Sequence, residues 1–355
     1  MIRRGKGIAC MFYPIGFTEY PNPSAAYMKV EIDGSAVLYT GSTDIGQGST
    51  TVMCQIASEV TGIAYEKIRV ICADTLYTPY DTGSVASRVT YITGNAVMLA
   101  AKECRDMLFH AAAIMLNLVV GDVEKEMRVG DDCVYLSGYE EAVVSIADAA
   151  RFSCTKLGRP VNGKGIFNPV TMQLSADNGH GKPYGTHVFA AQLAIVEVDD
   201  ETGKFEIIKV YAAHDCGKAL NPMLLEGQIF GGVSMGIGFG CYEELQYKNA
   251  KIANDQFTNY ILPSAMDVPS IEACAVERYD CTGPFGAKGV GEPALLPTAA
   301  AIANAIHDAV GVFITDLPIT PEKVFMAIKR YRASGRAVTG HSEEVDREGQ
   351  ATPVR

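Results

Sequence analysis

The sequence predicts an α+β protein made of two similar units, each with a mixed sheet and helices. A β-hairpin, a polar loop with glycine and a helix follow one another in residues 26–60, and the same order returns in residues 188–241. Such a repeated order indicates two related units. Residues 156–180 between them are rich in Gly, Pro and Asn, which is typical of a connecting loop. The expected parts are a first unit over residues 1–178, a second unit over residues 179–332 and a mobile polar tail over residues 333–355.

In the first unit, segments with strand propensity lie on both sides of the turn Asp33-Gly34, which predicts a hairpin. A helix is expected after the hairpin, and it should end at Gly62 because glycine commonly terminates helices. The expected strands cover residues 26–32, 35–40 and 67–72, and the expected helices cover residues 49–60, 93–117 and 139–152.

In the second unit, the acidic turn of residues 199–203 joins two strand-like segments and predicts another hairpin. A glycine-rich helix follows the loop of residues 214–222. Near the end of the chain, Thr320 and Pro321 are typical of an N-cap residue and a first helical position. The expected strands cover residues 188–198 and 204–213, and the expected helices cover residues 223–241, 296–310 and 321–331.

The composition excludes several classes of protein. With 355 residues and a net charge of −11, the chain lacks the basic balance that nucleic-acid binding requires. Its densest apolar run, residues 107–120, is shorter than the roughly 20 residues that span a bilayer, and no signal peptide is legible. The ten cysteines are scattered singly with no Cys-x-x-Cys pair, which supports neither a disulfide framework nor a cysteine-ligated iron–sulfur cluster. We expect a cytoplasmic protein that does not enter a membrane.

Four polar loops rich in glycine lie where a predicted strand meets a helix, and they are the candidate functional segments. Glycine there lets the backbone approach a ligand closely, and N–H groups at a helix start favour anionic groups. The first loop is not a Walker A loop, because no Gly-Lys-Ser/Thr sequence follows it. Each loop alone could also be a tight turn, a helix cap or a close helix contact. The first to fourth loops are residues 43–49, 81–88, 221–232 and 286–293.

The neighbouring residues His214 and Asp215 could carry chemistry of another kind. They stand at the end of a predicted strand, where they could form a catalytic dyad or bind a metal. A structural hydrogen bond at the strand end is the favoured interpretation of this pair.

In this order and spacing, the loops resemble those of the molybdenum hydroxylase family, which includes xanthine dehydrogenase, aldehyde oxidoreductase and nicotinate dehydrogenase. The resemblance covers roughly residues 7–328 and is specific, because independent motifs keep both their order and their spacing. It implies the fold of the family's molybdenum cofactor-binding domain. The matching motifs are Asp44-Ile45-Gly46-Gln47-Gly48, Ala86-Ser87-Arg88, Asp215-Cys216-Gly217 with Asn221-Pro222, Gly227-Gln228 with Gly231-Gly232, and Lys288-Gly289-Val290-Gly291-Glu292-Pro293.

The resemblance implies a molybdenum-dependent oxidoreductase that hydroxylates an electron-poor carbon with oxygen from water. Glu292 matches the catalytic glutamate, which would act as a general base. The pterin dithiolene holds the metal in this family, so no protein ligand to molybdenum is expected. Phe17, Val85 and Ala86 match positions at the substrate pocket. The positions that match cofactor-contacting residues are Gly46, Gln47, Gly48, Ser84, Val85, Ala86, Ser87, Arg88, Val89, Gln228, Lys288 and Gly291.

The resemblance also implies partners, because most molybdopterin-binding polypeptides of the family are considerably longer than this chain. The chain resembles only their C-terminal half, as the medium molybdopterin subunit of nicotinate dehydrogenase does, and we expect such a subunit rather than a gene fragment. The expected partners are a large-type molybdopterin subunit, an iron–sulfur (2Fe–2S) subunit and an FAD subunit. The expected cofactor is molybdenum–molybdopterin in its cytosine dinucleotide form. The expected substrate is an N-heteroaromatic such as xanthine or nicotinate; an aldehyde or aromatic acyl-CoA enzyme and a non-catalytic scaffold subunit are the alternatives.

Overall fold

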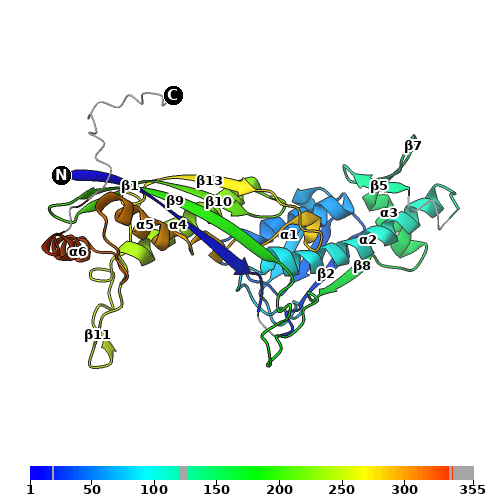
Figure 1. Ribbon diagram of the computed structural model, residues 1–355. Coiled ribbons are helices and arrows are strands. Elements are labelled where there is room, and N and C mark those ends of the chain that lie inside the picture. The colour runs from blue at the N-terminus through cyan, green and yellow to red at the C-terminus, as the bar shows by residue number, and fades with distance from the viewer. Residues whose placement is uncertain (18–19, 120–125, 336–337, 339–355) are drawn as a thin grey trace.

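The computed structural model describes residues 1–17, 20–119, 126–335 and 338. The molecule is elongated, with two units arranged along its length, and each unit contains a sheet with helices packed on one face (Figure 1). The prediction of an α+β fold is confirmed.

A four-stranded sheet and two long helices form the first unit. Their bounds are β2 Ser24–Val30, β3 Ala36–Thr40, α1 Ser49–Thr61, β4 Ile68–Cys72, α2 Gly94–Met115 and β8 Asn162–Phe167. The strand order is β4-β3-β2-β8. The predicted hairpin is confirmed, because β2 and β3 pair antiparallel around the turn Asp33-Gly34. β4 then pairs with β3 in parallel, which the crossover through α1 makes possible.

The strand β8 lies within residues 156–180, where the sequence predicts a loop. It pairs antiparallel with β2 at the edge of the sheet, and α2 packs directly on it. Gly165 permits this packing, since a Cβ there would lie 1.9 Å from the carbonyl oxygen of Ala96. Glycine weakens the strand pattern of a sequence. The residue that brings the helix close is therefore also the residue that made the segment look like a loop.

A three-stranded antiparallel sheet and a short helix complete the first unit. Their bounds are β5 Met127–Gly130, β6 Cys133–Leu136, β7 Tyr139–Ser145 and α3 Ile146–Thr155. The predicted helix over residues 139–152 is wrong in its first half, where β7 pairs with β6. Ser145 separates the two elements because its side chain accepts the N–H of Asp148 and so caps α3.

The second unit is a four-stranded sheet in the order β1-β9-β10-β13, with α5 packed on β1 and β9, and α4 packed on α5 and β13. A short arm with the strands β11 and β12 projects from it (Figure 1). The predicted hairpin and three helices are confirmed. The bounds are β1 Ile2–Pro14, β9 His187–Asp199, β10 Phe205–Asp215, α4 Pro222–Cys241, β11 Tyr247–Lys248, β12 Lys251–Ile252, β13 Ser270–Val276, α5 Thr298–Val310 and α6 Pro321–Ala333.

The strand β1 comes from the start of the chain yet lies in the second sheet. It pairs antiparallel with β9 along its whole length, from Ile2 opposite Asp199 to Pro14 opposite His187. The division of the chain at residue 178 stays a prediction. The strand β1 precedes this boundary in the sequence but belongs to the sheet of the second unit. The end of β1 thereby reaches the region where the two units meet.

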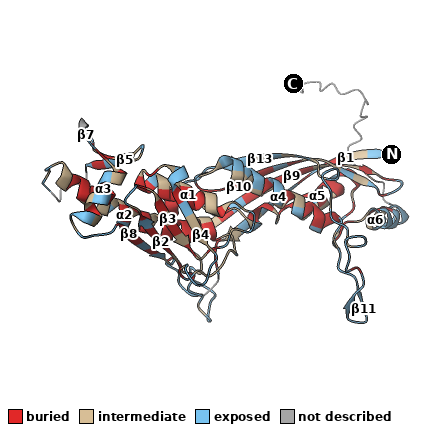
Figure 2. Ribbon diagram, turned by 180° about the vertical axis from the view of Figure 1, so that it is seen from behind, coloured by how far each residue is buried: buried red, intermediate tan, exposed pale blue. Residues whose placement is uncertain are grey.

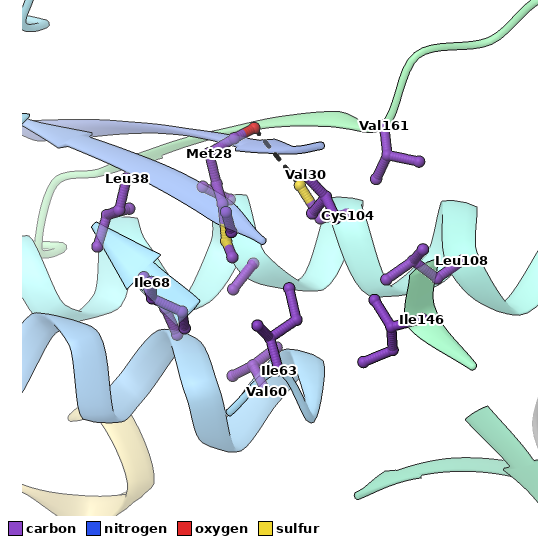
Figure 3. Packing of buried hydrophobic residues seen from close by; sticks show 14 of the residues in the cluster. Met28, Val30, Leu38, Val60, Ile63, Ile68, Cys104, Leu108, Ile146 and Val161 are labelled. Atoms are coloured by element: carbon purple, nitrogen blue, oxygen red, sulfur yellow. Dashed lines mark hydrogen bonds between the residues drawn. The ribbon is translucent and has the colours of Figure 1, made fainter. Parts of the chain in front are cut away.

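Each unit has its own apolar core (Figure 2). In the first core, Met28 and Leu38 of the sheet face α1 and α2, and Leu108 and Ile146 extend the cluster towards α3 (Figure 3). The thiol of Cys104 donates to the Met28 carbonyl, and burial raises the pKa of this thiol to about 12. All ten cysteines are free thiols. They act as small apolar residues where they are buried.

Within residues 1–17, 20–119 and 126–335, no helix has the length and apolar character needed to cross a membrane. The helix α6 ends at Ala333, where the predicted polar tail begins. Most of that tail lies outside the described residues, so its expected mobility stays a prediction.

Candidate active site

Glu292 opens a short 3-10 turn, Glu292–Ala294 (η5), where the two units meet. Its carboxylate oxygen Oε2 accepts hydrogen bonds from the hydroxyl of Tyr13, at 2.6 Å, and from the hydroxyl of Ser87, at 2.8 Å. The N–H of Glu292 donates to the same Ser87 oxygen, at 3.1 Å. The second carboxylate oxygen, Oε1, has no hydrogen-bond partner in the described part of the chain. One oxygen is thus held in place and the other is open to a reacting group.

Tyr13, near the end of β1, is a member of this site that the sequence did not reveal. Burial and the hydrogen bond to Glu292 raise the pKa of its phenol well above the usual value. The phenol therefore stays protonated at neutral pH and acts as a constant hydrogen-bond donor to Glu292. No local sequence signal could identify Tyr13, because its partner lies 279 positions away.

The second loop reaches the Glu292 carboxylate with a strained backbone. Ala86 and Ser87 have φ angles of 49° and 53°, left-handed values that are uncommon for residues with a side chain. Such strain persists only where surrounding contacts hold it, and it clusters at functional sites. The Ala86 carbonyl accepts the N–H of Gly16 at 3.1 Å, which brings the backbone next to Phe17 against this loop; the side chains of Phe17 and Val85 are both exposed. The three predicted substrate-pocket residues therefore share one region.

Arg88 anchors the second loop from inside the protein. Its side chain is fully buried, and its guanidinium donates six hydrogen bonds, one of them to the buried carboxylate of Asp81 at 2.7 Å. The other partners are groups of Asn22, Pro23, Ser24 and Gly83. Val89, the next residue, is also buried, where the π-helical turn Val89–Thr93 (η2) begins. A cofactor contact at either position would therefore come from the main chain.

The first loop is held in shape by its own side chains. The carboxylate of Asp44 accepts the N–H groups of Gly46, Gly48 and Thr50 and so covers the start of α1. Burial alone would raise the pKa of Asp44, but the hydrogen bonds from Thr50 and Gly46 prevail and hold it below its usual value. The amide of Gln47 also makes its hydrogen bonds within the loop. The loop thus presents its main chain in a fixed conformation.

The fourth loop is fixed on both sides of Gly289. A Cβ at Gly289 would lie 1.7 Å from the carbonyl oxygen of Ser87, so only glycine lets the second and fourth loops touch. Next to it, the ammonium of Lys288 forms a buried ion pair with Asp215 at 2.7 Å and donates to the His187 carbonyl at 3.0 Å. The ammonium of Lys288, for which a cofactor contact is expected, is therefore engaged inside the chain.

The predicted cofactor-contacting residues of three loops converge on a small cavity of about 80 Å³. Gln47, Gln228 and Lys288 all line it, at the start of α4. Ser84 ties the second loop to the same group, because its hydroxyl donates to the Thr43 carbonyl at 2.5 Å and accepts the Thr43 N–H at 3.0 Å. The four loops thus form one continuous region.

The structural interpretation of His214 and Asp215 is confirmed. Asp215 pairs with Lys288, and the buried imidazole of His214 lies 3.2 Å from the amide nitrogen of Gln192. Burial lowers the pKa of His214 to about 4, so its ring is neutral near pH 7. Across the described residues, no group of three or more His, Cys, Asp or Glu side chains is arranged to hold a metal ion. Gln192 is a site residue that the motifs do not include, although a lone amide within an apolar strand is a recognisable sequence signal.

A comparison with models of known protein families matches residues 1–269 to the molybdopterin cofactor-binding domain. The chain belongs to this family. The match covers most of the described residues, including the first, second and third loops. The family agrees with the resemblance that the loop motifs indicate.

Individual relatives of this molybdopterin-binding chain agree with the family. The putative xanthine dehydrogenase molybdenum-binding subunit XdhA of Escherichia coli is 32% identical over 332 residues, which are 91% of this chain and 42% of that protein. The nicotine 6-hydroxylase large subunit of Paenarthrobacter nicotinovorans is 35% identical over 309 residues, 86% of this chain and 36% of that protein. The crystal structure of the aldehyde oxidoreductase from Desulfovibrio desulfuricans superposes with a TM-score of 0.74 at 31% identity, covering 92% of this chain and 32% of that one. The chain spans less than half the length of these relatives.

The site of this molybdopterin-binding chain suits such a cofactor in its donor groups and in the accessible backbone of three glycines. A pterin that carries its own metal ligands requires N–H, hydroxyl and amide groups from the protein rather than a cluster of metal ligands. The loops supply such groups, among them the amide of Gln228, which lines the cavity, and the main chain of the first loop. At Gly46, Gly83 and Gly227, an added Cβ would meet no atom within 4 Å, so a ligand can lie directly against the backbone there.

Proposed function

We propose that the chain is the molybdopterin-binding subunit of a multi-subunit molybdenum hydroxylase, and that Glu292 is its general base. The enzyme would hydroxylate an electron-poor C–H carbon of an N-heteroaromatic such as xanthine or nicotinate, with oxygen from water. The single observation that carries the proposal is the arrangement of the Glu292 carboxylate, with Oε2 held by Tyr13 and Ser87 and Oε1 open. That arrangement lies among loops that match the molybdopterin-binding family.

The chain's own residues would position the base and accept the proton. Oε2 already accepts two hydroxyl donors, so Oε1 of Glu292 is the atom that would take a proton from the water-derived oxygen. The Gly16–Ala86 contact would hold Phe17 and Val85 beside the substrate. The cofactor, when bound, would supply the two-electron redox chemistry. In the scheme proposed here, Glu292 performs acid–base work and the loops perform binding.

The proposed partners follow from the length of the relatives and from the electron balance. The oxidation of a substrate releases two electrons, which would pass to an iron–sulfur (2Fe–2S) subunit and an FAD subunit. A large-type molybdopterin subunit would supply the part of the relatives that this chain does not span. We propose the cytosine dinucleotide form of the cofactor and a cytoplasmic location. Similarity to the XdhA subunit and to the nicotine 6-hydroxylase large subunit supports an N-heteroaromatic substrate.

The test is the variant Glu292→Gln, purified in the complex with its partner subunits. We expect the molybdenum content per complex to match the wild type and turnover of nicotinate and xanthine to fall by about 10²–10⁴-fold, the usual contribution of general acid–base catalysis. Glu322→Gln is the matched control, because Glu322 is an exposed carboxylate in the first turn of α6. Wild-type turnover by a fully loaded Glu292→Gln complex would show that Glu292 is not the base.

A second candidate substrate class is an aldehyde, which the similarity to the aldehyde oxidoreductase structure favours. The same wild-type complex separates the two classes when it is assayed with nicotinate, xanthine and an aromatic aldehyde. Turnover of the aldehyde alone would replace the N-heteroaromatic assignment. A complex that binds no molybdenum would instead support a non-catalytic scaffold.

A further inference from the structure

A buried polar cluster lies directly behind the turn that carries Glu292. Gln192 on β9, His214 on β10 and Thr298 at the start of α5 all have side chains that are closed to solvent. The Gln192 amide nitrogen donates to the carbonyl oxygen of Ala294 at 2.7 Å. The Gln192 amide oxygen accepts the hydroxyl of Thr298, also at 2.7 Å. The same nitrogen lies 3.2 Å from Nε2 of His214.

These contacts permit only one orientation of the amide. The Ala294 carbonyl can only accept, so the group that faces it must be the NH₂ of Gln192. The second N–H of that group then points at His214, whose Nε2 accepts and whose proton therefore lies on Nδ1. This requires a neutral imidazole, which agrees with the pKa of about 4 that burial gives His214. The Ala294 carbonyl thus fixes the orientation of the Gln192 amide, and that orientation in turn sets the tautomer of His214, whose Nδ1 has no hydrogen-bond partner among the described residues.

Packing alone does not explain an amide at this position. The inward-facing positions of β9 on both sides of Gln192 are apolar and buried. A buried amide is costly unless each polar atom finds a partner, and an apolar side chain of the same size would fill the space as well. The positions concerned are Val188, Ala190, Ala194, Val196 and Val198.

The partners of Gln192 lie on the segment that leads from Glu292 into α5. Ala294 is the last residue of the turn Glu292–Ala294, and Leu295 closes the turn by donating its N–H to the Glu292 carbonyl at 3.1 Å. Thr298 is the first residue of α5. Gln192 therefore ties this segment at two points to β9, which is an inner strand of its sheet.

We propose that Gln192 is a positioning residue for Glu292, an inference that rests on the proposed role of Glu292 as the base. Gln192 would fix the turn from behind, while Tyr13 and Ser87 hold the carboxylate from the front. A general base must keep its place relative to the reacting group, and a displacement of about 1 Å can reduce the rate about 10²-fold.

The test is Gln192→Met in the complete complex, because methionine approximates the volume of glutamine but offers no donor to Ala294. Leaving one buried carbonyl without a donor should speed amide hydrogen exchange in residues 291–298 by about 10- to 100-fold. The kcat should fall by about 10²-fold, with KM and molybdenum content near the wild-type values. Gln192→Leu, which also removes the donor without adding a charge, should give the same exchange and kcat results.

The matched control is Ser153→Ala, which removes a buried hydroxyl that donates to the Arg159 carbonyl at 2.7 Å in α3, far from Glu292. It should leave both exchange in residues 291–298 and kcat at the wild-type level. Wild-type exchange in that segment in both Gln192 variants would overturn the proposal, as would an equal loss of kcat in Ser153→Ala. Faster exchange combined with full turnover in Glu292→Gln would overturn the proposed function and support the attachment of the turn by Gln192.

Discussion

The hydroxyl of Tyr13 lies 2.6 Å from the carboxylate oxygen Oε2 of Glu292, although the two residues stand 279 positions apart. Tyr13 arrives on β1, and Glu292 arrives on the loop that precedes α5. Because α5 packs on β1, the same packing that builds the second core also brings these two side chains together. The site is thus a product of the fold of the second unit, completed by Ser87 from the first.

Tyr13→Phe tests this relationship directly. The change removes one hydrogen bond to a charged group, which is typically worth about 1.5–3 kcal/mol, and keeps the ring in place. We expect kcat to fall by about 10- to 100-fold while the molybdenum content stays at the wild-type level. The measurement is steady-state turnover of the complex together with metal analysis. The control is Tyr65→Phe, a change at an exposed tyrosine remote from the site; an equal loss in both variants would contradict the assigned contact.

Arg88→Met tests the internal anchor of the second loop. Removing one partner of a buried ion pair leaves Asp81 uncompensated, which usually costs about 3–5 kcal/mol. We expect the free energy of unfolding, measured by urea denaturation, to fall by about that amount. The exposed pair of Arg151 and Asp148 provides the control, since Arg151→Met should change stability by about 1 kcal/mol or less. A stable Arg88→Met protein that loses only cofactor would instead indicate that Arg88 contacts the cofactor.

His214 should make stability depend on pH in a defined window. Burial lowers the pKa of His214 to about 4 in the folded protein, whereas an unfolded histidine titrates near pH 6.5. The unfolded chain therefore binds a proton first as pH falls. The stabilisation is complete above about pH 6.5 and is lost progressively between about pH 6.5 and pH 4, by about 3 kcal/mol in total. Urea denaturation across this range should show the loss, and the slope should become smaller in His214→Gln.

The sequence predicted where the site would form better than how its charged side chains would point. Glycine and hydroxyl residues at the ends of strands marked the loops, because close backbone approach requires those residue types wherever they occur. The resemblance placed Arg88 and Lys288 among the cofactor-contacting positions, whereas both side chains form ion pairs inside the protein. Their partners, Asp81 and Asp215, are determined by tertiary packing, which a local sequence pattern does not reveal.

The errors in the predicted fold have similar causes. Residues 139–152 contain a strand and then a helix, with Ser145 as the helix cap between them. Hydrophobic periodicity does not mark a capping serine, so the boundary between the two elements was missed. The strand β8 was hidden by the glycines that let α2 approach it. By contrast, α1, α5 and α6 were well predicted because each has a periodic apolar face and a recognisable end.

The position of β1 also sets the order of events during synthesis. Its pairing partner β9 begins at His187, so at translation rates of about 5–20 residues per second roughly ten to forty seconds pass before β9 has been made. During that time β1 is a strand without a neighbour, open to pairing with another nascent chain. We therefore expect residues 2–14 to need shielding, for example by a chaperone, until β9 is complete.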